Sequence, residues 1–122
     1  MSDIRDYRDL IAWQRAMALA VLVDRVVDRL PQRSWKLASQ MRDASRSVHA
    51  NIAEGNGRLS IPDYLRHLGI SNASLNELES DLFFMERRHP HEEVTEALKL
   101  ALDTRRPLSG LIKALKKKRD EH

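Results

Sequence analysis

Apolar residues recur along the chain at the three-and-four spacing of amphipathic helices, and prolines, glycines and polar residues separate the periodic stretches. The pattern predicts helices over about residues 10–29, 35–54, 61–88 and 92–117. No stretch alternates between apolar and polar residues for long enough to indicate a strand. Because the connections are only about three to five residues long, sequential helices are expected to lie antiparallel. The predicted fold is therefore all-α, an up-down-up-down four-helix bundle that forms a single domain over residues 1–122.

A few residues set the predicted helix boundaries. Ser34 and Ser60 are expected to cap the second and third helices, because a serine hydroxyl accepts a hydrogen bond from a free amide of the first turn. Gly55 is expected to end the second helix, because glycine tolerates the left-handed conformation that closes many helices. Pro107 lies within the fourth helix, where the loss of a backbone donor predicts a kink.

The composition is that of a folded protein in a reducing compartment. Hydrophobic residues make up 42% of the chain and charged residues 32%, which is unlike the composition of disordered chains. The chain has no cysteine, so disulfides, thiolate metal clusters and cysteine nucleophiles are excluded. The longest apolar run, residues 16–23, is too short for a bilayer span. We therefore expect a soluble, cytoplasmic protein that does not associate with membranes.

The distribution of charge is more informative than the net charge of +3. In an up-down-up-down bundle the chain start, the second connection and the end of the last helix meet at one end. This predicted basic pole would contain Arg5, Arg8, Arg58, Arg66, Lys113, Lys116, Lys117, Lys118 and Arg119. The stretch 77–103 instead carries eight acidic residues against three basic ones. One interpretation is that the late basic residues only complement the dipole of the last helix. The other is a nucleic-acid site, formed by Arg58, Arg66, Lys113, Lys116, Lys117, Lys118 and Arg119.

Three polar residues, Ser47, Asn51 and Glu54, follow one stripe of the second predicted helix beside its apolar stripe. Buried polar groups require partners, and the third helix offers Ser74, Glu77 or the free amides near Ser60. These three residues lack an adjacent base, nucleophile or metal-binding set. The favoured interpretation is a structural polar clamp that fixes helix register, and the alternative is a ligand or catalytic cluster.

No enzymatic chemistry is indicated by the sequence. Glu86 and His89 have the spacing found in di-iron bundles, but such sites need a second pair and further glutamates. No serine, histidine and aspartate constellation can be identified. We therefore expect a non-enzymatic protein without catalytic residues, metal or cofactor.

Several blocks of the sequence resemble one family. The matching blocks are residues 9–16, Pro31, residues 40–42 with Ala44 and Ser47, Asn51-Ile52-Ala53-Glu54-Gly55 with Gly57 and Arg58, Ser74-Leu75 and Glu77-Leu78-Glu79. In these positions the chain resembles the 23S rRNA intervening-sequence proteins, four-helix bundles whose relatives include the accessory variability proteins of diversity-generating retroelements. The resemblance covers about residues 7–115. It implies a homopentameric ring, and in the retroelement relatives a basic pentamer that binds nucleic acid and a reverse transcriptase.

Three positions depart from the family pattern. Asp43 stands where a basic residue is common, Ala73 where glycine is common, and Pro107 interrupts a helix that is usually unbroken. The first departure weakens the expectation of phosphate binding on that face of the second helix. The third is expected to bend the last helix.

The chain also has more large apolar residues than one bundle core requires. The surplus beyond the predicted core stripes comprises Leu19, Leu22, Val26, Ile70, Phe83, Phe84, Leu100 and Leu102. A second buried surface would absorb them, which predicts a homo-oligomer. Two functions stay open: an oligomeric scaffold that binds RNA or DNA, in particular structured RNA or an RNA–protein complex, and a protein–protein adaptor that docks a partner such as a reverse transcriptase.

Overall fold

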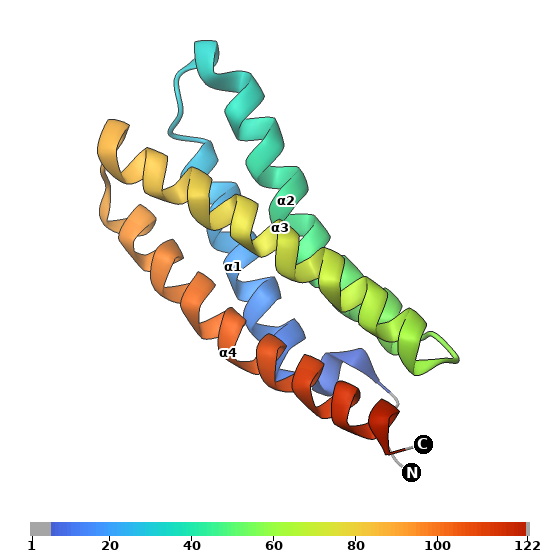
Figure 1. The fold of residues 1–122 in the computed structure, drawn as a ribbon. Helices are drawn as coiled ribbons and strands as arrows, with labels where there is room; N and C mark the ends of the chain where they lie inside the picture. The colour runs from blue at the N-terminus through green and yellow to red at the C-terminus, as the bar shows by residue number, and fades with distance from the viewer. Residues whose placement is uncertain (1–5, 122) are drawn as a thin grey trace.

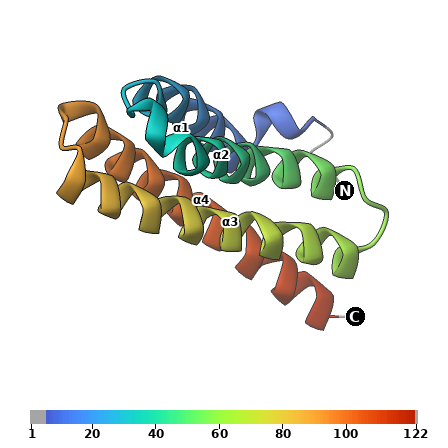
Figure 2. The same cartoon turned by 90° about the horizontal axis from the view of Figure 1, so that it is seen from above.

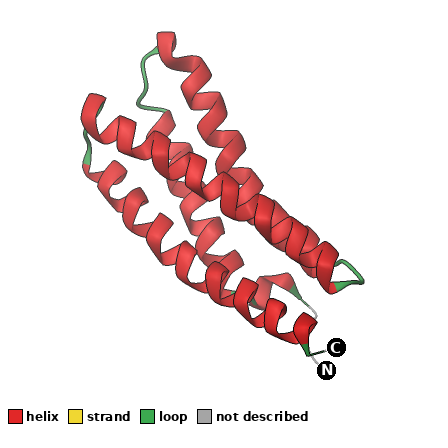
Figure 3. Cartoon of the chain, in the orientation of Figure 1, coloured by secondary structure: helices red, strands yellow, loops and turns green. Residues whose placement is uncertain are grey.

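The structure, a computed structural model, describes residues 6–121 and is helical apart from short connections (Figure 3). Its elements in chain order are the 3₁₀ turn η1 (Tyr7–Asp9), α1 (Ile11–Val27), the 3₁₀ turn η2 (Gln32–Ser34), α2 (Trp35–Asn56), α3 (Ile61–Arg88) and α4 (Glu92–Asp120). Residues 6–121 contain no strand, so the prediction of an all-α fold with four helices is confirmed. Arg5, predicted to belong to the basic end, lies outside the described residues.

Each α-helix packs against two others, so the helices form a ring of neighbours in the order α1, α2, α3, α4 (Figures 1 and 2). Ser74 of α3 donates a hydrogen bond to Ser47 of α2 at 2.8 Å. One turn further along α2, Asn51 contacts His67, which lies earlier on α3. The two helices therefore run in opposite senses. Figure 1 places the α2–α3 connection and the C-terminal end of α4 at the same end of the molecule.

The core takes in more of α1 than the sequence indicated. Leu19, Leu22 and Val26, predicted to form part of a second buried surface, are at most 2% exposed and lie in the core. The prediction was wrong for these three residues because α1 packs against both α2 and α4, so its buried face is wider than one stripe. Trp13 at the start of α1 is only partly buried and packs edge-on against Tyr7.

Two of the predicted helix boundaries need correction. Ser34 precedes α2 as expected, but its side chain makes no capping hydrogen bond, because it belongs to the 3₁₀ turn that leads into the helix. Gly55 does not end α2, which continues to Asn56 and is capped by Gly57 in a right-handed conformation. At Ser60 the prediction is confirmed, since its Oγ accepts a hydrogen bond from the Asp63 amide at 3.2 Å.

Helix α4 continues through Pro107 to Asp120. Proline has no amide hydrogen, so the carbonyl of Asp103, four residues earlier, loses its helical donor. The Arg15 guanidinium of α1 donates to this carbonyl at 3.4 Å. The Arg15 side chain therefore partly replaces the hydrogen-bond donor that the proline lacks. The segment beyond Pro107 keeps its helical conformation.

Membrane crossing requires a long and strongly apolar helix. None of the helices in the described part of the chain meets both requirements.

Candidate nucleic-acid interface

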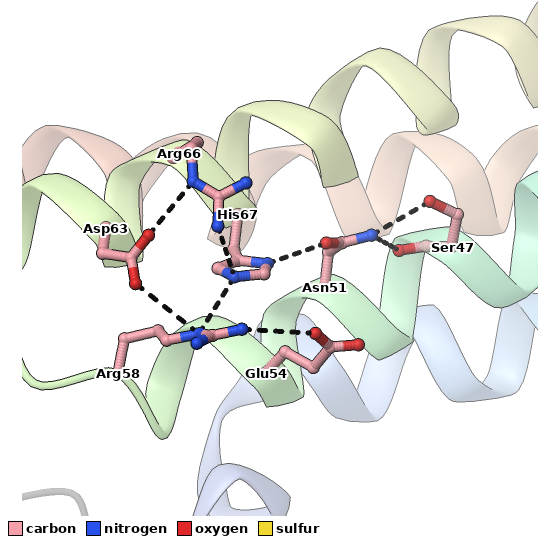
Figure 4. Close-up of polar contacts among 7 residues, drawn as sticks. All are labelled: Ser47, Asn51, Glu54, Arg58, Asp63, Arg66 and His67. Atoms are coloured by element: carbon pink, nitrogen blue, oxygen red, sulfur yellow. Dashed lines mark hydrogen bonds and ion pairs between the residues drawn. The ribbon is translucent and has the colours of Figure 1, made fainter.

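The end of α2 and the start of α3 bring a group of polar side chains together around His67, which is only 4% exposed (Figure 4). We refer to this group as the turn network, and it consists of Ser47, Asn51, Glu54, Arg58, Asp63, Arg66 and His67. The helices position these residues, because Ser47, Asn51 and Glu54 follow one stripe of α2 while Asp63, Arg66 and His67 lie in the first two turns of α3.

Hydrogen bonds fix the orientation of the side chains at the centre of the network. Asn51 Nδ2 donates to the Ser47 carbonyl at 3.0 Å and to its Oγ at 3.1 Å, so Asn51 Oδ1 faces His67 Nδ1 at 2.9 Å. An amide oxygen only accepts, so His67 Nδ1 carries the proton. On its other side the ring accepts through Nε2, to which Arg58 Nε donates. The imidazole therefore joins the polar stripe of α2 to whatever donors lie on its outer side.

Two guanidiniums supply these donors. Arg58 Nε and Arg66 Nη2 each lie 3.1 Å from His67 Nε2. Asp63 lies between the two cations, at 3.0 Å from Arg66 Nε and 3.6 Å from Arg58 Nε, and Glu54 lies 3.8 Å from Arg58 Nη2. Two carboxylates thus accompany two guanidiniums, so the turn network offers little net positive charge to a polyanion.

Gly55 allows α2 and α3 to approach closely beside the network. A Cβ on this residue would lie 2.8 Å from Tyr64 Cδ1 and 3.0 Å from His67 Cβ. Tyr64 packs into this contact, its hydroxyl donates to Asn56 Oδ1 at 3.2 Å, and burial raises the pKa of Tyr64 to about 12. The glycine is therefore required for close packing and not for a left-handed turn.

The C-terminal end of α4 has a different character. Its basic residues are all exposed, and we refer to them as the basic end: Lys113, Lys116, Lys117, Lys118 and Arg119. Arg119 pairs with Asp120 at 2.9 Å, whereas the four lysines form no ion pair with any side chain of residues 6–121. Arg105, earlier on α4, is paired with Glu79 of α3 at 3.1 Å. Uncompensated positive charge is thus concentrated in the last turns of α4.

Comparison with known families decides what kind of protein this is. The profile of the 23S rRNA-intervening sequence protein family matches residues 8–110. The chain belongs to this family. A comparison with curated proteins finds no match. Within this intervening-sequence protein, the turn network lies inside the matched region, whereas the basic end begins after it.

The structure places the predicted site residues of this family member in two groups. Arg58 and Arg66 meet at His67, and the five residues of the basic end follow one another along α4. Arg8, a further residue of the predicted pole, is engaged by Asp6 at 2.6 Å. Ser47 meets Ser74, one of the partners considered for the clamp, whereas Glu54 faces Arg58 instead of a neighbouring helix. The clamp therefore joins α2 to α3 through Ser47 and Asn51.

Sequence reasoning missed His67, the residue that connects the two halves of the network. A signal was present, because His67 lies three residues after Tyr64 and four before Ser71 on the buried side of α3. A polar ring in that position needs partners from a neighbouring helix. Asn51 and Arg58, both singled out from the sequence, are those partners.

His91, in the α3–α4 connection, has a structural role in this protein. His91 Nδ1 accepts a hydrogen bond from the Glu93 amide at 3.1 Å and caps α4. Within the described residues, no group of three or more histidine, aspartate or glutamate side chains is arranged to hold a metal ion.

Proposed function

We propose that this protein is a non-enzymatic, oligomeric, cytoplasmic scaffold that binds nucleic acid through the basic end. The observation that carries the proposal is the run of exposed lysines, Lys113 and Lys116 to Lys118, without carboxylate partners among residues 6–121. Such charges gain affinity for phosphate by releasing counterions. The name of the family refers to 23S rRNA, which favours structured RNA or an RNA–protein complex as the ligand.

Binding of this kind does not depend on the base sequence. Lysine ammonium groups contact phosphates as point charges and carry no information about bases. Arg58 and Arg66 belong to the same proposed interface, but their contacts with His67 and Asp63 already occupy part of their donors. Their contribution to affinity is therefore smaller than that of the lysines.

We further propose that the up-down-up-down bundle assembles into a homo-oligomeric ring, a pentamer in keeping with the family resemblance. Exposed apolar side chains support this: Ile70, Phe83, Phe84 and Leu102 stay 40–50% exposed in the single chain. A ring would bring several basic ends together. The combined field would then be much stronger than that of one subunit with a net charge of +3.

The same exposed apolar residues favour the second candidate, a protein–protein adaptor that docks a partner such as a reverse transcriptase, with nucleic acid as an incidental ligand. A pull-down with the wild-type protein separates the two functions. A partner that stays bound after nuclease treatment and in high salt would favour the adaptor.

The test of nucleic-acid binding is a gel-shift titration of a structured RNA with two variants of equal net charge. In the first, Lys116, Lys117 and Lys118 are changed to glutamate. In the control, the exposed cations Arg33, Lys36 and Lys99 are changed to glutamate, two of which lie at the opposite end of the bundle. We expect the first variant to lose binding and the control to keep most of it. Equal retention of RNA by both variants and the wild type would refute the proposal.

A further inference from the structure

Two lateral surfaces flank α2, and each contains a shallow hollow. The hollow between α1 and α2 has a volume of about 320 Å³, and its lining includes Val21, Arg42, Arg46 and His49. The hollow between α2 and α3 has a volume of about 300 Å³, and its lining includes Asp43 and Glu77. We refer to these surfaces as the α1–α2 face and the α2–α3 face. They are similar in size and differ in charge.

The α1–α2 face contains one cation without a partner among residues 6–121, although its two arginines are matched in number by Asp24 and Asp28. Arg42 is satisfied within the chain, since it pairs with Asp24 at 3.1 Å and with Asp28 at 2.8 Å. Arg46, one turn further along α2, forms no ion pair with any side chain of residues 6–121. Burial lowers the pKa of His49, and the positive charge of Arg46 lowers it further. Arg46 is therefore available to a carboxylate from outside the chain.

The α2–α3 face contains carboxylates instead. Asp43 and Glu77 line its hollow, and neither pairs with a cation in the described part of the chain. Asp81 lies one turn beyond Glu77 on α3. Burial raises the pKa of Asp81, and the negative charge of Glu77 raises it further. The α2–α3 face therefore presents unpaired carboxylates, whereas the α1–α2 face presents an unpaired guanidinium.

Both faces also expose apolar side chains. Ile70, Glu77 and Phe84 are spaced by seven residues and so follow one stripe of α3, with Ile70 40% and Phe84 50% exposed. On the other face Val21 is 53% exposed beside Arg46. Apolar side chains next to uncompensated charges are typical of surfaces that bind proteins.

We infer that the α1–α2 face of one copy of this chain docks on the α2–α3 face of a second copy, with Arg46 reaching Asp43 and Glu77 and with Val21 packing near Phe84. The two faces are unlike, so a pair keeps one free face of each kind, one on each copy. Contacts of this heterologous type close into rings when the rotation between copies allows it. This inference rests on the proposed assembly and assigns its contact surfaces.

The test is a charge exchange followed by measurement of mass in solution. Arg46→Glu and Glu77→Lys are made separately and together, and each protein is studied by native mass spectrometry and light scattering over a concentration series. Each single substitution places like charges across the contact, so we expect self-association at least about tenfold weaker than in the wild type. The double variant restores opposite charges at positions 46 and 77 while Asp43 is unchanged, so it is expected to associate more strongly than either single variant. Arg106→Glu and Glu96→Lys make the same charge changes on exposed positions of α4 and should leave association unchanged.

The outcomes separate the assignment of the faces from the proposal of an assembly. A wild-type protein that is monomeric at all concentrations would overturn both. A wild-type oligomer whose mass and affinity are unaffected by either single substitution would overturn only the assignment. So would a double variant that stays dissociated while circular dichroism shows it to be folded. Phe84→Ser provides a second, charge-independent variant and is expected to weaken association without changing helix content.

Discussion

The turn network and the basic end both contribute cations to the predicted pole, yet they differ in what surrounds those cations. In the turn network Arg58 and Arg66 share an acceptor on His67 and are accompanied by Asp63 and Glu54. In the basic end four lysines project from exposed turns with no carboxylate partner among residues 6–121. A guanidinium held by fixed acceptors orients the helices, whereas an unpaired ammonium contributes to the external field. Arg58 and Arg66 therefore differ from the lysines of the basic end in their surroundings, although each residue contributes the same charge.

The family match divides the chain at the same place. It spans residues 8–110, which includes the whole turn network and stops before Lys113. The turn network thus lies in the part of the chain that matches the family. We expect the nucleic-acid affinity proposed for this chain to depend on residues that lie beyond the matched region.

The difference between the turn network and the basic end is tested most strongly by the salt dependence of RNA binding. Changing Lys116, Lys117 and Lys118 to glutamine removes three phosphate contacts, so the slope of log affinity against log salt should decrease by about two for single-stranded RNA. Arg66→Gln should decrease it by less than one, because Asp63 and His67 already engage that guanidinium. Fluorescence anisotropy at several salt concentrations measures both slopes. A larger change for Arg66→Gln than for the lysine variant would reverse the proposed roles.

The next largest effect concerns stability and should arise only in the turn network. His67→Leu fills the same space but leaves Asn51 Oδ1 without its donor, and such an unsatisfied group costs about 1–3 kcal/mol. We expect urea unfolding to show a loss of about 2 kcal/mol, whereas the lysine variant should stay within about 0.5 kcal/mol of the wild type. His67→Asn retains an N–H donor and should recover part of the loss. An unchanged midpoint for His67→Leu would mean that the network does not stabilise the fold.

A smaller effect separates two glycines within helices. Gly55→Ala places a methyl group 2.8 Å from Tyr64 Cδ1, and overpacking of this kind costs about 1–3 kcal/mol, partly offset by the better helix propensity of alanine. We expect a net loss of about 1 kcal/mol. Gly69 has open space around its Cα, so Gly69→Ala should instead gain about 0.5–1 kcal/mol. Thermal unfolding of the two variants compares them directly, and a gain for both would argue against close packing at Gly55.

The periodic pattern was sufficient to predict the helices. Each α-helix begins within one residue of its predicted start and ends within three of its predicted end, because apolar stripes and residues such as Ser60 act locally. The pattern did not define how much of α1 is buried, since that depends on which helices lie on either side of it. Leu22 and Val26 face the core because α1 has two neighbours, α2 and α4.

The positions of the site residues were predicted only in part, because some of them act between helices. Contacts of Ser47 and Asn51 with α3 could be predicted because their spacing on one helix is visible in the sequence. His67 was missed, and Gly55 was assigned to the wrong role, because both act across the contact between α2 and α3. Contacts between helices depend on register, and local propensity carries no information about register.

Two carboxylates, Glu93 and Asp81, also differ in whether a cation accompanies them. Hydrogen bonds from Arg29 and Arg25 lower the pKa of Glu93. Its carboxylate therefore adds stability above the unfolded-state pKa of about 4.5, and this contribution is lost as the pH falls through the folded-state value. Burial and Glu77 raise the pKa of Asp81, so its carboxylate costs stability above the folded-state pKa, and the cost disappears as the pH falls through that value.

Substitution by the neutral amide should therefore have opposite signs at the two positions. At pH 7 we expect Glu93→Gln to destabilise the protein and Asp81→Asn to stabilise it, and both effects should be small because solvent screens these charges. Both differences should shrink as the pH is lowered toward 3, because the wild-type carboxylates then become protonated. Urea unfolding of the wild type and both variants between pH 3 and 7 gives the two differences. If Asp81→Asn were destabilising at pH 7, the α2–α3 face would already contain a cation that balances Asp81, and its charge would not be available to a second copy.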